Sequence, residues 1–173
     1  MYIRFKRIKK ESGNTYEYCY LVGSKWRKRK KQAKQVHSKF LGRVYNFEEN
    51  ENKRDIKYII ENNSSTNIIK EILVNELICR GFEKNKEMYE KDGIIIDFEK
   101  KSVKFANRDS VIRVGDKGIS EYTLSRVLRF DRITSMDEGK EFIKSLKECG
   151  IKISGEELFL LIDKMNRENS GIH

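Results

Sequence analysis

Hydrophobic and polar residues alternate with a period of two near the start of the chain, which is the period of a β-strand with one buried face. In YIRFKRIK, Ile3 and Phe5 fall on one face, whereas Arg4 and Lys6 fall on the other. A glycine and an asparagine then favour a turn, and YEYCYLV resumes the alternation. A third, more irregular basic segment follows. The pattern predicts a three-stranded antiparallel β-module over residues 1–45.

The next stretch, residues 46–64, is polar and rich in Asn and Glu, and it predicts a linker. Beyond it the hydrophobic period changes to 3.6 in TNIIKEILVNELICRG, which predicts a helix. Ser65 or Thr66 is expected to cap its start, and Gly81 is expected to end it. Residues 65–173 are predicted to form the second domain.

Within this second domain, GIIIDFEKKSVKF predicts a β-hairpin that pairs Ile94–Asp97 with Val103–Phe105, and SVIRV predicts a further strand. Three helical patterns follow, in SEYTLSRVLRF, SMDEGKEFIKSLKECG and SGEELFLLIDKMNRE. The last two open on Ser-x-x-Glu, which is the pattern of a capping box. The expected fold class is α+β: a small antiparallel module, then a helix, a hairpin plus a strand, and three C-terminal helices.

Charge is distributed unevenly along the chain. The excess behind the net charge of +10 lies in residues 1–43, which hold fourteen Lys or Arg and two acids. The remaining 130 residues hold twenty-three basic and twenty-five acidic side chains, so the second domain is near neutral. A local cluster of cations is stronger evidence for a polyanionic partner than an alkaline composition spread over the whole chain.

Three uses compete for the basic segment. A solvated tail would lack aromatic residues and alternation, and a membrane-surface element would be a helix with an apolar face. The segment instead combines cations with aromatic residues on strands, as contacts to phosphates, sugars and bases require. We therefore expect it to bind nucleic acid, duplex DNA before RNA, and no membrane. The expected contact residues are Arg4, Lys6, Arg7, Lys25, Trp26, Arg27, Lys28, Arg29, Lys30, Lys31, Lys34, Lys39 and Arg43.

The roles of the aromatic residues stay open. Trp26 can anchor the core of the module, since a sheet this small needs one large apolar residue, or it can stack on nucleic acid. Tyr16, Tyr18 and Tyr20 share one face of their strand, and the sequence does not say whether that face is buried. Plain solvation of the Lys and Arg cluster is the alternative to nucleic-acid binding.

The order of these elements resembles a known type of sequence. The strand YIRFKRIK, a Y-x-YLV strand and a basic strand ending in Phe40-Leu41-Gly42 are similar to the β-ribbon that opens many insertion-sequence transposases of the DDE type, and to stand-alone archaeal proteins with the same opening. The resemblance covers about 45 of the 173 residues and implies DNA contact by the opening ribbon. It does not imply transposition, because the remaining chain is too short for a ribonuclease-H-like core and shows no spaced Asp, Asp and Glu.

An enzymatic function is not expected. Asp92, Asp97 and the triplet Glu99–Lys101 are loosely similar to the acidic layout of metal-dependent nucleases, but the triplet falls where the predicted hairpin must turn. We expect no catalysis, no metal and no cofactor. A small metal-dependent nuclease or transposase-derived protein is one alternative, and an RNA- or ribosome-associated protein is another.

The remaining features are weaker indicators. The three cysteines lack metal-ligand spacing, which predicts reduced thiols in a cytoplasmic protein. The apolar runs are shorter than a membrane span. Arg126, Arg129 and Arg132 recur every third residue and predict a solvated or ion-paired face. Residues 65–173 are expected to position the module, to bind a protein partner or to self-associate.

Overall fold

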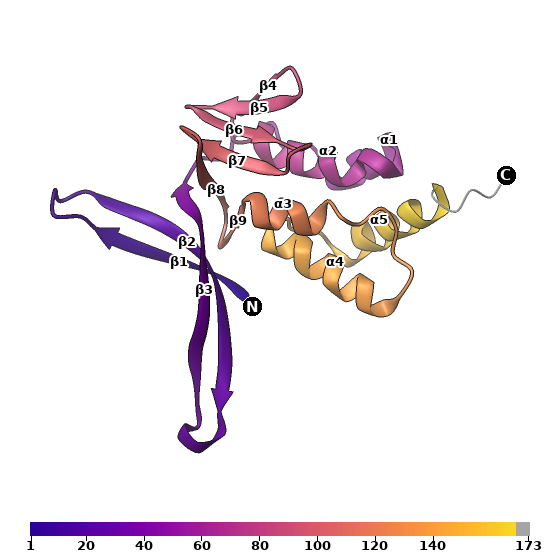
Figure 1. The fold of residues 1–173 in the computed structure, drawn as a ribbon. Coiled ribbons are helices and arrows are strands. Elements are labelled where there is room, and N and C mark those ends of the chain that lie inside the picture. The colour runs from indigo at the N-terminus through magenta and orange to yellow at the C-terminus, as the bar shows by residue number, and fades with distance from the viewer. Residues whose placement is uncertain (169–173) are drawn as a thin grey trace.

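The computed structural model describes residues 1–168, except for the side chains of His37 and Glu168. In that part of the chain, nine strands form one sheet in the order β1-β2-β3-β8-β7-β6-β5-β4, and β9 pairs with β8. Helices follow and interrupt the strands, so the predicted α+β fold class with antiparallel strands at the N-terminus is confirmed. Figure 1 shows the helices gathered on one side of the molecule and the first three strands on the other.

The module consists of β1 (Tyr2–Lys9), β2 (Thr15–Arg27) and β3 (Gln32–Tyr45). Pairing of β1 with β2 ends at Tyr2 and Val22, whereas β2 and β3 remain paired as far as Arg27 and Gln32. Residues 23–37 therefore form a two-stranded ribbon, here called the ribbon arm, with the short helix η1 (Lys28–Lys30) at its tip. In Figure 1 the ribbon arm projects away from the helices.

The module is joined to the rest of the sheet through β3. Its last residues pair in parallel with β8 (Arg108–Val114), from Arg43 opposite Ser110 to Tyr45 opposite Ile112. Beside this junction lies a small apolar cluster that module and body share. The cluster contains Cys19, Leu21, Leu41, Val44 and Val111, with Ile3, Phe5 and Tyr122 packed against it. The module thus docks on the body (residues 46–168) through one face of its sheet.

The body continues the sheet and covers it with helices around the main hydrophobic core, which contains fully buried Ile72, Ile96, Ile112 and Leu124. Its other strands are β4 (Glu83–Asn85), β5 (Met88–Lys91), β6 (Ile94–Asp97), β7 (Ser102–Phe105) and β9 (Lys117–Ile119). Its helices are α1 (Ile56–Asn62), α2 (Ser65–Ile78), α3 (Glu121–Val127), α4 (Met136–Glu148) and α5 (Gly155–Glu168). The hairpin of β6 and β7, the strand β8 and the three C-terminal helices are where the sequence predicts them.

Helix α1 lies inside the range that the sequence predicts as a linker, residues 46–64. Asp55 caps the helix by accepting a hydrogen bond from the Lys57 backbone N–H, and Ile56, Ile59 and Ile60 are buried in the main core. Polar residues surround these three isoleucines, so the composition of residues 46–64 as a whole indicates a linker although a short amphipathic helix lies within it. This part of the chain therefore packs as an element of the body.

Two of the three predicted helix starts are confirmed. Ser135 and Glu138 form a reciprocal capping box at α4, and Ser154 and Glu157 exchange the same two hydrogen bonds at α5. The predicted cap of α2 by Ser65 or Thr66 is wrong, because Ser64 is the N-cap and the helix begins one residue earlier. Among the described residues, no helix has both the length and the apolar character needed to cross a membrane.

Candidate nucleic-acid interface

The module carries a face of alternating cations and aromatic rings, opposite to the face that docks on the body. Strand register places Lys6, Tyr18 and Arg43 in one row across the three strands. The next row consists of Arg4, Tyr20 and Phe40. We call this surface the outer face. Its cations are exposed, and Phe40 keeps 51% of its surface accessible.

The aromatic rings of the outer face pack against one another and hold a fixed arrangement. The Phe40 ring centroid lies 5.6 Å from that of Tyr20 and 6.1 Å from that of Tyr18, in tilted and edge-on geometries. The Arg43 guanidinium stacks over the Tyr16 ring at 4.3 Å. The sequence does not say whether Tyr16, Tyr18 and Tyr20 face the core or the solvent. In the structure all three are half-exposed and lie on the outer face.

The ribbon arm is lined by cations on one face and by Trp26 on the other. Lys25 pairs with Lys34 across the strands, and Trp26 pairs with Ala33. Trp26 keeps 60% of its surface accessible, so its interpretation as the core anchor is wrong. The large apolar residues of the module core are instead Leu21 and Leu41, which pack with Val44 against the body.

The expected contact residues divide into three groups. Eight of them, Lys25 through Lys31 and Lys34, belong to the ribbon arm, and all are exposed. Arg4, Lys6 and Arg43 belong to the outer face. Register places Arg7 opposite Glu17 and Lys39 opposite Leu21, on the other face of the sheet, so the structure does not bring these two together with the rest.

Ion pairing distinguishes the module from the body. Of the thirteen expected contact residues, only Arg7 has an ion-pair partner among the described residues, and that partner is Glu17 at 3.5 Å. In the body, by contrast, Arg54, Arg126 and Arg129 each lie against a carboxylate. The ion-paired interpretation of the arginine series is thereby confirmed for Arg126 and Arg129. Apart from Arg7, the cations among these contact residues carry positive charge that no carboxylate of the described chain compensates.

Glu17 connects the module to the body. Its carboxylate accepts a hydrogen bond from Arg113 Nη1 at 2.7 Å, and the Arg113 guanidinium also lies 4.3 Å from the Phe5 ring centroid. The nearby Cys19 thiol is buried, and this burial raises its pKa to about 12. The docked face is therefore fastened by apolar packing, one half-buried ion pair and one cation–π contact, which leaves the outer face and ribbon arm accessible.

The nuclease-like residues lie in turns or, for Asp97, at the end of strand β6. Glu99 and Lys100 lie in the turn between β6 and β7, as the sequence predicts, and Asp97 accepts a hydrogen bond from the Lys100 backbone N–H at 3.0 Å. That hydrogen bond and the Lys100 ammonium hold the pKa of the Asp97 carboxyl below its ordinary value. Asp92 has a positive φ of 49° in the turn that precedes β6. The Asp97 carboxylate thus has a structural role in the turn between β6 and β7.

One group of side chains in the body has the composition of a metal site. Ligand atoms of Glu49, Glu76 and Cys79 lie within 4.8 Å of one another. Cations already pair with both carboxylates. Arg80 Nη1 donates to Glu76 at 2.7 Å, Lys53 Nζ lies 2.6 Å from the other Glu76 oxygen, and Arg80 Nη2 lies 2.5 Å from Glu49. Burial acts to raise the pKa of Glu49, but Arg80 and Lys53 outweigh it and hold that pKa below its ordinary value.

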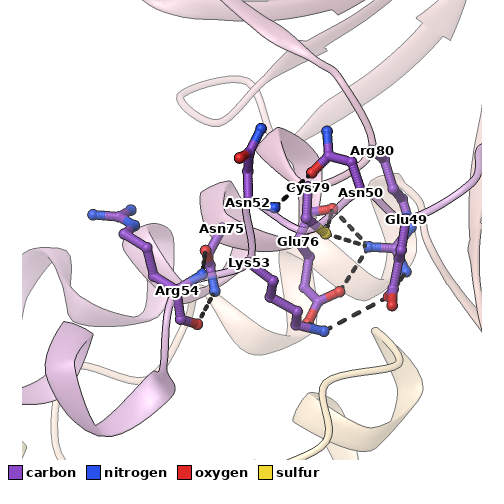
Figure 2. A network of polar contacts seen from close by, with 9 residues as sticks. All are labelled: Glu49, Asn50, Asn52, Lys53, Arg54, Asn75, Glu76, Cys79 and Arg80. Carbon is purple, nitrogen blue, oxygen red and sulfur yellow. Dashed lines mark hydrogen bonds and ion pairs between the residues drawn. The ribbon is translucent and has the colours of Figure 1, made fainter.

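Figure 2 shows how this network attaches the chain before α1 to helix α2. Asn75 extends it by exchanging two hydrogen bonds with the backbone of Arg54, at 2.8 and 2.9 Å. A metal ion would have to displace Lys53 and Arg80 from a buried site, which leaves their charges without compensation. We therefore assign the network a structural role.

A search for similar proteins finds no matching family model, no matching curated protein and no matching solved structure. The resemblance of residues 1–45 to transposase openings consequently remains a prediction from the sequence pattern.

Proposed function

We propose that this protein binds nucleic acid through its N-terminal module and that duplex DNA is its main partner. One observation carries the proposal: the ribbon arm projects from the body with eight expected contact residues, and none of its cations has an ion-pair partner among the described residues. Exposed like charges on a rigid ribbon are an unfavourable arrangement that a row of phosphates would compensate.

The shape of the ribbon arm favours a duplex. The major groove of B-DNA admits a two-stranded β-ribbon, and the tip of this ribbon carries five consecutive cations from Arg27 to Lys31. With the ribbon in the groove, its lysines and arginines can reach the phosphates on either side while Trp26 packs against sugars or base edges. Charge supplies most of the affinity in this arrangement.

RNA or a single strand is the second candidate, because the outer face also has the composition of a stacking platform. Tyr18, Tyr20 and Phe40 form a half-exposed aromatic surface beside Arg4 and Arg43. Stacking of an unpaired base on an aromatic side chain contributes roughly 1–3 kcal/mol and does not depend on base identity. Competition between a duplex and a matched single-stranded RNA distinguishes the two candidates.

The proposal assigns no catalysis and no cofactor to the chain. It keeps the cytoplasm as the expected compartment, with three free and buried cysteines as the support. A protein partner or self-association through the body remains an expectation from the sequence. A small metal-dependent nuclease is the alternative to be tested by adding Mg²⁺ or Mn²⁺ and measuring cleavage in the unchanged protein and in Glu99→Ala.

A pair of matched variants tests the proposal. Lys28→Gln/Lys30→Gln removes two charges from the tip of the ribbon arm, and Lys84→Gln/Lys86→Gln removes two from exposed positions on the body. Titration of labelled duplex DNA over a salt series is expected to show a shallower salt dependence for the arm variant, by about 0.9 per lost phosphate contact. Equal binding by both variants would show that the ribbon arm does not contact DNA.

A further inference from the structure

Two surface depressions adjoin each other beside α4. The first, of about 450 Å³, lies between the start of β1 and α4, and the second, of about 580 Å³, lies between the turn before β9 and the chain that follows α4. Lys117 and Lys147 line both depressions, so the two adjoin at these lysines, and together they are called the hollow. Neither contains a residue that the sequence singles out for binding.

Lysines surround this hollow. Three of them, Lys140, Lys144 and Lys147, lie on one side of α4 at helical spacing, and Lys117 and Lys152 complete the set. We call these five residues the body track. Lys140 pairs with Asp137 at 3.1 Å, and Lys117 pairs with Asp116 at 3.0 Å.

The remaining acids of α4 do not neutralise the body track. Glu138 is held in the capping box, Glu141 pairs with Arg129, and Glu148 pairs with Arg126 at 3.0 Å. Among the residues that the structure describes, Lys144 and Lys147 have no ion-pair partner, and the same holds for Lys152. Although the net charge of the body is close to zero, the body thus has a local positive surface at the body track.

Tyr2 connects the body track to the module. It lines the first depression, and it also lies on the outer face of β1, two residues before Arg4. Its register partner Val22 comes two residues after Tyr20 on the same strand, and Tyr20 is the register partner of Arg4. A polyanion that leaves the outer face past Tyr2 therefore meets Lys144 and Lys147 next.

We propose that the body track binds the phosphate backbone of the same nucleic acid, beyond the segment that the module contacts. The proposal rests on the proposed function and extends the interface from the module onto the body. It rests on charge complementarity, because three exposed lysines have no carboxylate partner within the described residues 1–168, and on Tyr2, which both lines the first depression and lies on the outer face.

The test compares Lys144→Gln/Lys147→Gln with the control Lys84→Gln/Lys86→Gln on a labelled duplex of about 30 base pairs, roughly 100 Å at about 3.4 Å per base pair. All four lysines are exposed, and circular dichroism checks that both variants remain folded. The track variant is expected to bind roughly tenfold more weakly at about 0.1 M salt, with a salt slope smaller by about 2. The control is expected to bind like the unchanged protein.

Equal binding by the track variant and the control would overturn this inference, because Lys144 and Lys147 would then make no contact with the duplex. Measurement of Lys28→Gln/Lys30→Gln in the same series separates the two claims. If that variant loses affinity while the track variant does not, the inference fails and the proposed function stands. If the unchanged protein binds no duplex, the proposed function itself fails.

Discussion

Lys25 and Lys34 lie directly opposite each other across β2 and β3, with both ammonium groups on the same face of the ribbon arm. Like charges in this arrangement destabilise a free sheet by roughly 0.2–1 kcal/mol. A bound phosphate would compensate both charges. The pair therefore makes the ribbon arm less stable alone and more complementary to a polyanion.

The first prediction follows from this pair. Lys25→Gln/Lys34→Gln is expected to leave the melting temperature unchanged or to raise it slightly, because the repulsion is removed. The same variant is expected to weaken duplex binding, because two phosphate contacts are lost. Calorimetry and fluorescence anisotropy measure the two effects. A variant that loses stability while retaining affinity would contradict this role for the pair.

The second prediction concerns Gly42, where β3 passes closely over β8. A Cβ added to Gly42 would lie 2.5 Å from the backbone oxygen of Asp109, and the φ of Gly42 is 141°. Gly42→Ala is expected to lower the free energy of unfolding by about 3 kcal/mol or more, since backbone strain and overpacking act together. Gly13→Ala is the control, because Gly13 also has a positive φ but no atom within 4 Å of the added Cβ.

Urea denaturation distinguishes these glycine variants. Gly13→Ala is expected to cost about 1 kcal/mol from its positive φ alone. If Gly42→Ala costs no more than Gly13→Ala, then β3 and β8 are not in close contact. The presence of a glycine at position 42 would then not be explained by the close approach of β3 to β8.

The third prediction concerns the ion pair between Glu17 and Arg113. Glu17 is nearly buried and Arg113 is half-buried. Glu17→Gln is therefore expected to lower the free energy of unfolding by about 1–3 kcal/mol, between the values for exposed and fully buried ion pairs. Lys104→Gln removes the exposed pair with Asp109 and is expected to cost less than about 1 kcal/mol. Equal costs in chemical denaturation would show that Glu17 does not fasten the module.

The fourth prediction concerns alkaline pH. Burial raises the pKa of Cys19 and that of Cys149 to about 12, from an ordinary value of 9.0. Above pH 9 the unfolded thiols lose protons that the folded thiols keep, so the free energy of unfolding falls as pH rises. Each thiol contributes a slope of about 1.4 kcal/mol per pH unit between these pKa values.

Comparison of the unchanged protein with Cys19→Ala/Cys149→Ala isolates this effect from other groups that titrate at high pH. The double variant is less stable at pH 8 because it has two cavities. Its stability is nevertheless expected to fall less between pH 9 and pH 10. Parallel stability curves for the two proteins would show that these thiols are not protonated in the folded state at pH 10.

The sequence predicts most of the fold because most of the predicted elements carry a clear pattern. The strand around Ile3 alternates, the strand around Ile96 is a short apolar run, and α4 and α5 show both amphipathic spacing and a capping pattern. Helix α1 is missed because its three isoleucines are embedded in a polar stretch. The strands β4, β5 and β9 are missed because they are short and mostly polar or lack an apolar run, whereas the equally short β6 contains three consecutive isoleucines.

The candidate interface is less accessible from the sequence. The register of β2 and β3 shifts at Cys19/Tyr20 and again at Gly23/Ser24, so alternation alone does not show which rings share the outer face. Whether a cation is paired depends on contacts between distant residues, as Arg113 and Glu17 illustrate. The spacing of Lys140, Lys144 and Lys147 is visible in the sequence, but their connection with Tyr2 appears only in the fold.

Binding of duplex DNA by the whole chain is best measured by fluorescence anisotropy with a labelled duplex across a salt series. We predict binding with a steep salt slope, between about −5 and −9 for six to ten phosphate contacts, and stronger binding to the duplex than to a matched RNA. Absence of binding at about 50 mM salt would contradict it. The ribbon arm would then be a solvated surface, despite its unpaired charge.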